Sequence, residues 1–189
     1  MAMRLHEVHP SIVHFPLTLL PLSIGADALG RLTGNERLMW LGKRGIAAAA
    51  VAGAAAGVTG LIAQEEVKAS GPARDMLITH RNLNIAAVGV ASGLAIQRAQ
   101  TDRPSLGYLL TGFAALGAAV YSAYLGGTLV YQHGVGVAPA GGTYEGGGPE
   151  LTPENVGRVA TEIGRGIGQG VKHMAEETSE GKIVPSLAQ

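Results

Sequence analysis

Three stretches of the chain without a charged side chain constrain its fold more than any other sequence feature. They are residues 45–63, 85–97 and 105–132, and tyrosine is the only titratable residue type within them. A helix at the surface of a soluble protein needs a polar face, so helices that are apolar all round indicate a lipid environment. Charged residues make up 15% of the 189 residues, against roughly 25% in soluble globular proteins. The pattern predicts an all-α integral membrane protein in contact with the lipid bilayer.

Four membrane-spanning helices are expected, at residues 10–32, 45–64, 80–98 and 105–133. At about 1.5 Å per residue each reaches across a hydrocarbon core of about 30 Å, the third only just. Pro16 and Pro21 interrupt backbone hydrogen bonding in the first helix and predict a kink there. Residues 35–44 and 64–79 are expected to be connections. Residues 1–137 are therefore predicted to form a four-helix transmembrane bundle.

A glycine- and proline-rich linker is predicted at residues 138–151, followed by an amphipathic helix and tail at residues 152–189. Thr152 is placed to cap this helix, with Pro153 in its first turn. Apolar residues then recur at helical spacing, at Val156, Val159, Ile163, Ile167, Val171 and Met174. Such a helix lies on the membrane surface, packs against a partner subunit or docks on its own bundle, and these alternatives stay open. Residues 176–189 are expected to form a loose tail.

The distribution of basic residues predicts the orientation in the membrane. Four antiparallel spans place both termini on one side, together with residues 64–79. Near the membrane, that terminal side carries Arg4, Lys68, Arg74 and Arg81, and the opposite side carries Arg31, Arg37, Lys43, Arg44, Arg98 and Arg103. Loops richer in lysine and arginine stay in the cytoplasm. We therefore expect a multi-pass protein of the bacterial inner (plasma) membrane with both termini in the periplasm.

Polar side chains are predicted to gather in one layer at the terminal side, where all four spans begin or end. The members are His6, His9, His14, Gln64, Glu65, Glu66, His80, Arg81, Asn82, Asn84, Tyr131 and His133. His14 lies about one turn inside Pro10, and a polar side chain at that depth suggests function by default. His6 is expected to be solvated and His173 to be incidental. Asp27, near the opposite face, is expected to be an interfacial residue at a helix end.

Histidines that converge from several helices are typical of haem b held by two axial imidazoles. We expect two of His14, His80 and His133 to bind the iron, with His9 as a further ligand if two haems bind. Arg81 is expected to pair with a haem propionate. Glycines along the later spans leave room for a porphyrin edge, or else serve close packing of helices. The leading hypothesis is a b-type cytochrome-like electron-transfer subunit.

Two other functions stay open. The first is a non-haem site for copper, zinc or iron, with His14, His80 and His133 as metal ligands alongside His9 and Glu65 or Glu66. The second is a structural or assembly subunit with interfacial histidines. Its glycine-rich helix faces and C-terminal helix would contact a redox partner or further copies of the chain.

Composition and motifs exclude several other classes. The chain has no cysteine, which rules out disulfides, thiolate metal sites and iron–sulfur ligation by its own residues. Balanced charge without a basic cluster gives no reason to expect nucleic acid as a partner. The sequence contains no nucleophile elbow, phosphate loop or zinc-protease motif, so a complex subunit is expected rather than an independent enzyme.

Two stretches resemble the signature sequences of a known family. The first is His9-Pro10-Ser11-Ile12-Val13-His14-Phe15-Pro16, and the second is Gly126-Gly127-x-Leu129-Val130-Tyr131-x-His133-Gly134-Val135-Gly136-Val137. Together they resemble the bacterial predicted membrane proteins known as domain of unknown function 2231, over about residues 6–137. The resemblance implies a four-helix membrane unit, with relatives fused to Rieske iron–sulfur or cytochrome-type domains, and so suggests membrane redox chemistry. The matching histidines are His9, His14 and His133, with His80 where the family has a histidine opening its third span.

Overall fold

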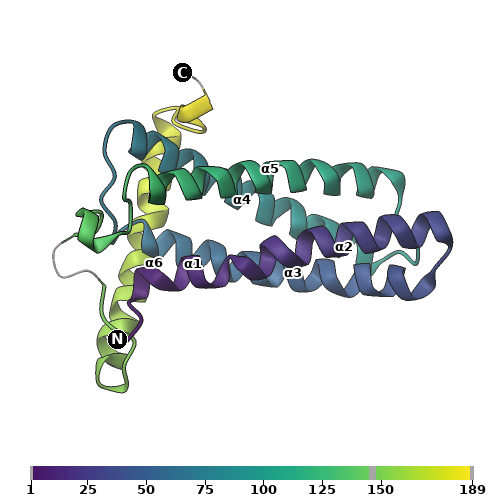
Figure 1. Ribbon diagram of the computed structural model, residues 1–189, viewed down its shortest axis with the longest axis horizontal. Helices are drawn as coiled ribbons and strands as arrows, with labels where there is room; N and C mark the ends of the chain where they lie inside the picture. The colour runs from purple at the N-terminus through teal and green to yellow at the C-terminus, as the bar shows by residue number, and fades with distance from the viewer. Residues whose placement is uncertain (1, 145–147, 188–189) are drawn as a thin grey trace. The chain divides into compact units, whose positions relative to one another are not determined.

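The chain folds almost entirely into helices (Figure 1). The computed structural model describes residues 2–144 and 148–187, so residues 145–147 of the predicted linker and residues 188–189 of the predicted tail lie outside the described residues. The α-helices are α1 (Val8–Ile12), α2 (His14–Thr33), α3 (Glu36–Ala63), α4 (Pro72–Ala99), α5 (Leu106–Tyr131) and α6 (Val156–Ser179). Short 3-10 turns are η1 (Leu5–Glu7), η2 (Ala138–Ala140), η3 (Pro153–Asn155) and η4 (Pro185–Leu187). The described residues form isolated β-bridges but no strand, which confirms the all-α prediction with its C-terminal helix.

Three helical stretches are long and apolar enough to cross a membrane: Leu5–Thr33, Glu36–Ala63 and Leu106–Tyr131. Helix α4 falls outside this set, and its first turns carry charged residues such as Arg74 and Asp75. Large apolar side chains point outward along the helices, among them Val51 and Val120 at 73% and 69% exposure. A contiguous apolar exterior of this kind suits contact with lipid.

Two of the predicted connections are wrong, because α3 and α4 begin well before the apolar stretches do. Helix α3 starts at Glu36, where the Asn35 side-chain oxygen accepts hydrogen bonds from the Arg37 and Leu38 amides at 3.0 and 3.2 Å. Helix α4 starts at Pro72, directly after Gly71 in a left-handed conformation with φ of 54°. Capping asparagine and first-turn proline fix these starts whatever the hydropathy of the residues that follow.

The predicted interruption of the first span falls at Val13, between α1 and α2. The carbonyl of Ile12 would accept a helical hydrogen bond from residue 16, but that residue is proline and has no N–H group. Regular bonding resumes when the Leu17 amide donates to the Val13 carbonyl at 3.2 Å. Pro21, by contrast, lies inside the continuous helix α2.

The chain divides into two compact units, and α3, α4 and α5 each contribute to both. Unit 1 comprises Met1–Ser11, Gly57–Leu83 and Ser122–Gln189, and unit 2 comprises Ile12–Ala56 and Asn84–Tyr121. Within unit 2, segments of α2, α3, α4 and α5 lie side by side (Figure 1) and share a core of Leu20, Ile24, Ile46, Ala49, Leu94, Tyr108 and Leu109. A smaller core in unit 1 is built from Val67, Ala73, Leu129 and Val135. The described part of the predicted linker and α6 both belong to unit 1.

A buried ion pair joins α2 and α4 inside unit 2. Asp27 and Arg98 are 0% and 1% exposed, and Arg98 Nε donates to both carboxylate oxygens at 3.1 Å while Nη2 donates to Oδ1 at 3.0 Å. Tyr108 on α5 donates its hydroxyl to Oδ2 at 2.9 Å. The other Arg98 donors reach the carbonyls of Thr101 and Met39 at 2.7 and 2.9 Å. The expectation of an interfacial Asp27 is therefore wrong: its partner lies 71 positions further along the chain.

We predict that Asp27→Ala and Arg98→Ala each lower the stability of the protein by about 3–5 kcal/mol, because each leaves a buried charge without its partner. The free energy of unfolding of the double variant should fall by less than the sum of the two single losses, since the second change removes the buried charge that the first left without a partner. Unfolding of the purified protein in detergent measures all three. Lys172→Ala, in an exposed pair with Glu176, is the control and should cost no more than about 1 kcal/mol. Single losses as small as the control's would contradict a structural role for the pair.

Candidate functional site

Two of the predicted ligands, His9 on α1 and His80 on α4, face each other within unit 1. Their ring centroids lie 6.4 Å apart and their planes are nearly perpendicular, at 81°. Each ring rests against a glycine of another helix. A Cβ added to Gly60 on α3 would lie 3.1 Å from His9 Cε1, and one added to Gly126 on α5 would lie 3.0 Å from His80 Cε1. These two glycines thus make room for the imidazoles themselves.

The backbone of α5 fixes the tautomer of His80. Its Nδ1 lies 2.8 Å from the carbonyl oxygen of Ser122, and a carbonyl only accepts hydrogen bonds. Nδ1 therefore carries the proton of the neutral ring, and Nε2 carries the lone pair. The Ser122 hydroxyl adds contacts with Nδ1 at 3.1 Å and with the His80 carbonyl at 3.3 Å. A histidine whose Nδ1–H is held by a carbonyl is the usual arrangement of a metal-binding imidazole.

The other predicted ligands are placed differently. His14 opens α2 in unit 2, and its side chain is exposed on that helix. His133 follows the end of α5 at Tyr131 and is also exposed. Within the described residues, no group of three or more His, Cys, Asp or Glu side chains is arranged to hold a metal ion.

Two histidines that were expected to be unimportant have carboxylate partners in unit 1. His6 is 7% exposed rather than solvated, and its Nδ1 lies 3.3 Å from Glu66 Oε2. Burial raises the pKa of Glu66 above its ordinary value, and the His6 charge opposes that rise. His173 on α6 is not incidental, because its Nδ1 lies 3.0 Å from Glu65 Oε1. Sequence spacing could not pair residues so far apart in the chain.

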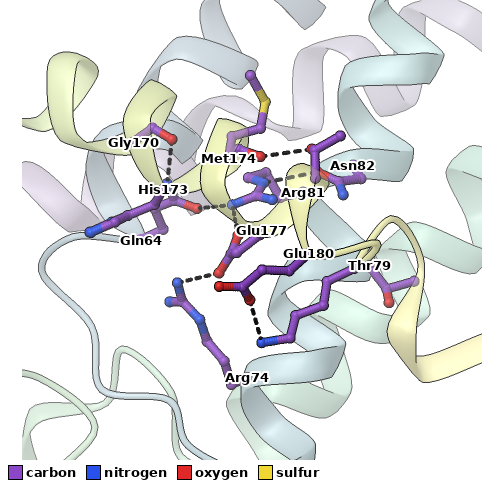
Figure 2. Close-up of polar contacts among 12 residues, drawn as sticks. Gln64, Arg74, Thr79, Arg81, Asn82, Gly170, His173, Met174, Glu177 and Glu180 are labelled. Carbon is purple, nitrogen blue, oxygen red and sulfur yellow. Dashed lines mark hydrogen bonds and ion pairs between the residues drawn. The ribbon is translucent and has the colours of Figure 1, made fainter.

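Arg81 lies at the centre of a buried network in unit 1 (Figure 2). Its Nη1 donates to Glu177 at 2.7 Å and to Gln64 at 3.3 Å, and its Nε donates to Asn82 at 2.9 Å. Arg74 reaches the second oxygen of Glu177 at 2.6 Å. Arg81, expected to hold a propionate, here holds a carboxylate from the C-terminal segment.

Glu177 is the residue that sequence reasoning missed, because residues 176–189 were expected to be loose. Helix α6 instead continues to Ser179. Beyond it, the Asn82 side chain donates to the Ile183 carbonyl at 2.7 Å and the Ser186 amide donates to the Thr79 hydroxyl at 3.1 Å. The described tail is therefore docked, and that prediction is wrong. The buried positions of α6 are Gly166, Gly170 and Glu177, which recur at helical spacing.

Small residues let α6 pack closely on the end of α3. Gly166 and Gly170 are buried: a Cβ added to Gly166 would lie 3.2 Å from Ile62, and one added to Gly170 would lie 2.8 Å from the Leu61 carbonyl oxygen. Gln64 Nε2 also contacts the Gly170 carbonyl at 3.4 Å. Of the three placements considered for the amphipathic helix, docking on its own chain is the one observed.

The fold and these sites define an α-helical integral membrane protein, and its histidine-bearing unit 1 includes one end each of α3, α4 and α5. The chain belongs to the family described as "Predicted membrane protein (DUF2231)", whose model matches residues 5–139. The resemblance seen in the two signature stretches is thereby confirmed. Helix α6 and its carboxylate Glu177 lie beyond the matched residues. No curated protein and no solved structure matched the chain.

We predict that Gly126→Ala disturbs the histidine pair and that Gly127→Ala does not. The added methyl at position 126 would press on the His80 ring, whereas nothing lies within 4 Å of a Cβ at position 127. Overpacking of this kind costs about 1–3 kcal/mol, while an unhindered Gly→Ala change in a helix gains up to about 1 kcal/mol. Thermal unfolding in detergent compares the two neighbours. Equal effects would show that the glycine at 126 is not needed to seat His80.

We predict that Glu177→Gln destabilises the protein and flattens its stability profile in acid. Burial acts to raise the pKa of Glu177, but hydrogen bonds and charge from Arg81 and Arg74 outweigh it and hold the pKa below the ordinary value of 4.5. The carboxylate therefore contributes stability that is fully present above about pH 4.5 and is lost as the pH falls through the lower folded-state pKa.

The measurement is the unfolding midpoint between pH 7 and pH 3, with Glu176→Gln as the matched control. Glu176 is exposed and pairs only at 3.8 Å with Lys172. Breaking the Arg81 pair should cost about 3–5 kcal/mol at pH 7, and the control no more than about 1 kcal/mol. An unchanged acid profile in Glu177→Gln would mean that other carboxylates dominate acid unfolding.

Proposed function

We propose that this protein is a b-type cytochrome-like subunit in which His9 and His80 bind one haem. The observation that supports this most directly is the facing pair of imidazoles, 6.4 Å apart between centroids. Two metal–imidazole bonds of about 2.0–2.1 Å together span about 4 Å, and half of each ring adds to that span. A centroid separation of 6.4 Å is therefore compatible in length with one iron held between two imidazoles. A haem iron needs two protein ligands at most, whereas protein-bound zinc takes three or four. A two-histidine site therefore suits haem better than a bare ion.

Each neighbouring residue has a defined task in this proposal. The Ser122 carbonyl keeps the proton on His80 Nδ1, so Nε2 is the atom that would bind the iron, with its basicity raised by this hydrogen bond. Gly60 and Gly126 seat the two rings and so limit their rotation. When bound, haem supplies reversible one-electron transfer, with a potential set by its axial ligands and their hydrogen bonds. The apolar helices hold this unit at the membrane.

The proposed partners follow from that chemistry. A one-electron carrier exchanges electrons with a redox protein or membrane cofactor, so we propose such a partner at the face of unit 1. In keeping with the bias of basic residues, we place unit 1 with both termini on the periplasmic side. Both proposals are independent of which histidines bind the iron.

The test is the optical spectrum and pyridine haemochrome of the full-length protein purified from cells supplied with haem. We predict a Soret band and about one haem per chain. His80→Ala and His9→Ala should each lower haem content at least about tenfold, because each removes one axial ligand. His173→Ala is the matched control, since it removes a unit 1 histidine that lies outside the pair.

His14→Ala and His133→Ala decide between this pair and the pairs favoured by sequence. Retention of haem in both supports His9 and His80, whereas loss in either assigns a ligand elsewhere. Absence of a Soret band from the wild-type protein, with copper, zinc or iron found by elemental analysis, would replace haem by a non-haem metal. Absence of both would leave the histidine pair structural.

A further inference from the structure

A cavity of about 710 Å³ lies in unit 1, and its lining includes neither His9 nor His80. Its polar lining comes from three separate segments: Arg4, His6 and Glu7 at the N-terminus, Lys68 after α3, and Thr143 and Tyr144 after α5. The loop at residues 136–139 adds an apolar wall. Its volume falls within the range of about 300–1,000 Å³ that is typical of small-molecule sites.

Short backbone pairings build this cavity. Val67 and Thr143 form one antiparallel bridge, and the Lys68 amide donates to the Gly142 carbonyl at 2.9 Å. Arg4 and Glu150 form a second bridge, next to a hydrogen bond from the Leu151 amide to the Met3 carbonyl at 2.8 Å. These pairings hold segments distant in sequence at one place. The lining side chains are therefore positioned by the backbone and not only by chance proximity.

Among the described residues, the carboxylates near the cavity all contact groups other than Lys68. Glu7 accepts the Arg4 backbone amide at 2.7 Å, Glu66 lies beside His6, and Glu150 lies 3.9 Å from the Arg4 guanidinium. Among the described residues, no carboxylate lies within ion-pair distance of Lys68, whose Nζ sits 5.7 Å from the centre of the Tyr144 ring. The Arg4–Glu150 pair is long and about half exposed, and such pairs contribute little.

A buried imidazole lies beside these cations. His6 is 7% exposed and lines the cavity, and its Nδ1 lies 3.3 Å from Glu66 Oε2. Lys68, Arg4 and an imidazole, with two hydroxyls beside them, are the donor set that a phosphate group prefers.

We propose that this cavity binds a phosphate group, with Lys68 as its principal cation and Arg4 as the second. The apolar wall at residues 136–139 then contacts the organic part of a phosphate ester. Two sources share this chemistry: the headgroup of an anionic phospholipid, or a soluble phosphate ester. The site is separate from the proposed haem ligands, so it does not depend on that proposal.

The test uses the full-length protein and two kinds of probe. Glycerol phosphate is titrated into the detergent-solubilised protein by calorimetry, and lipid retention is measured by native mass spectrometry after reconstitution with phosphatidylglycerol or phosphatidylcholine. We expect Lys68→Gln to weaken binding about tenfold, the loss of one charged hydrogen bond. Lys68→Arg should retain binding, and Lys172→Gln, an exposed lysine on α6, should match the wild type.

The outcomes separate the sources and can overturn the proposal. Saturable binding of glycerol phosphate that weakens in Lys68→Gln supports a soluble ester. Selective retention of phosphatidylglycerol that is lost in Lys68→Gln supports a lipid headgroup. Failure of the wild type to bind either probe overturns the proposal, and so does equal binding by Lys68→Gln and Lys172→Gln.

Discussion

A guanidinium buried among helices has to meet a carboxylate, and this constraint organises each unit of the protein. In unit 2, Arg98 satisfies its requirement with Asp27 and two backbone carbonyls, while Tyr108 takes up the remaining carboxylate oxygen. The network ties side chains of α2, α4 and α5 to the backbone of α3. Because the donors of Arg98 and Tyr108 all have acceptors, we assign this cluster a structural role and not a catalytic or binding role.

Unit 1 satisfies the same constraint with a residue from the far end of the chain. Arg81 and Arg74 on α4 share the carboxylate of Glu177 on α6, and Gln64 and Asn82 take up further donors. The C-terminal segment is consequently part of the folded unit. The matched family region ends at residue 139, so the carboxylate that neutralises these arginines in this chain comes from outside it.

Because Arg74 and Arg81 are held in ion pairs with Glu177, the imidazoles are the groups in unit 1 best placed to bind a ligand. His9 and His80 are seated on glycines, and a backbone carbonyl sets the tautomer of His80. His6, which pairs with Glu66, belongs instead to the wall of the cavity. Unit 1 thus contains two polar regions, one built around a histidine pair and one around Lys68, and its N-terminal segment contributes to both.

The sequence by itself determined the membrane class, the helical architecture and the family, because charge-free stretches and two signature motifs are local in the chain. It also placed His9 and His80 in the correct polar layer, since helix order alone brings those ends together. Only the tertiary structure decided which residues meet: Asp27 with Arg98, Arg81 with Glu177, and His6 with Glu66. The helix starts at Glu36 and Pro72 were also missed, because capping overrides hydropathy. Which residues form ion pairs across many tens of positions depends on tertiary packing and burial, and local sequence patterns do not contain that information.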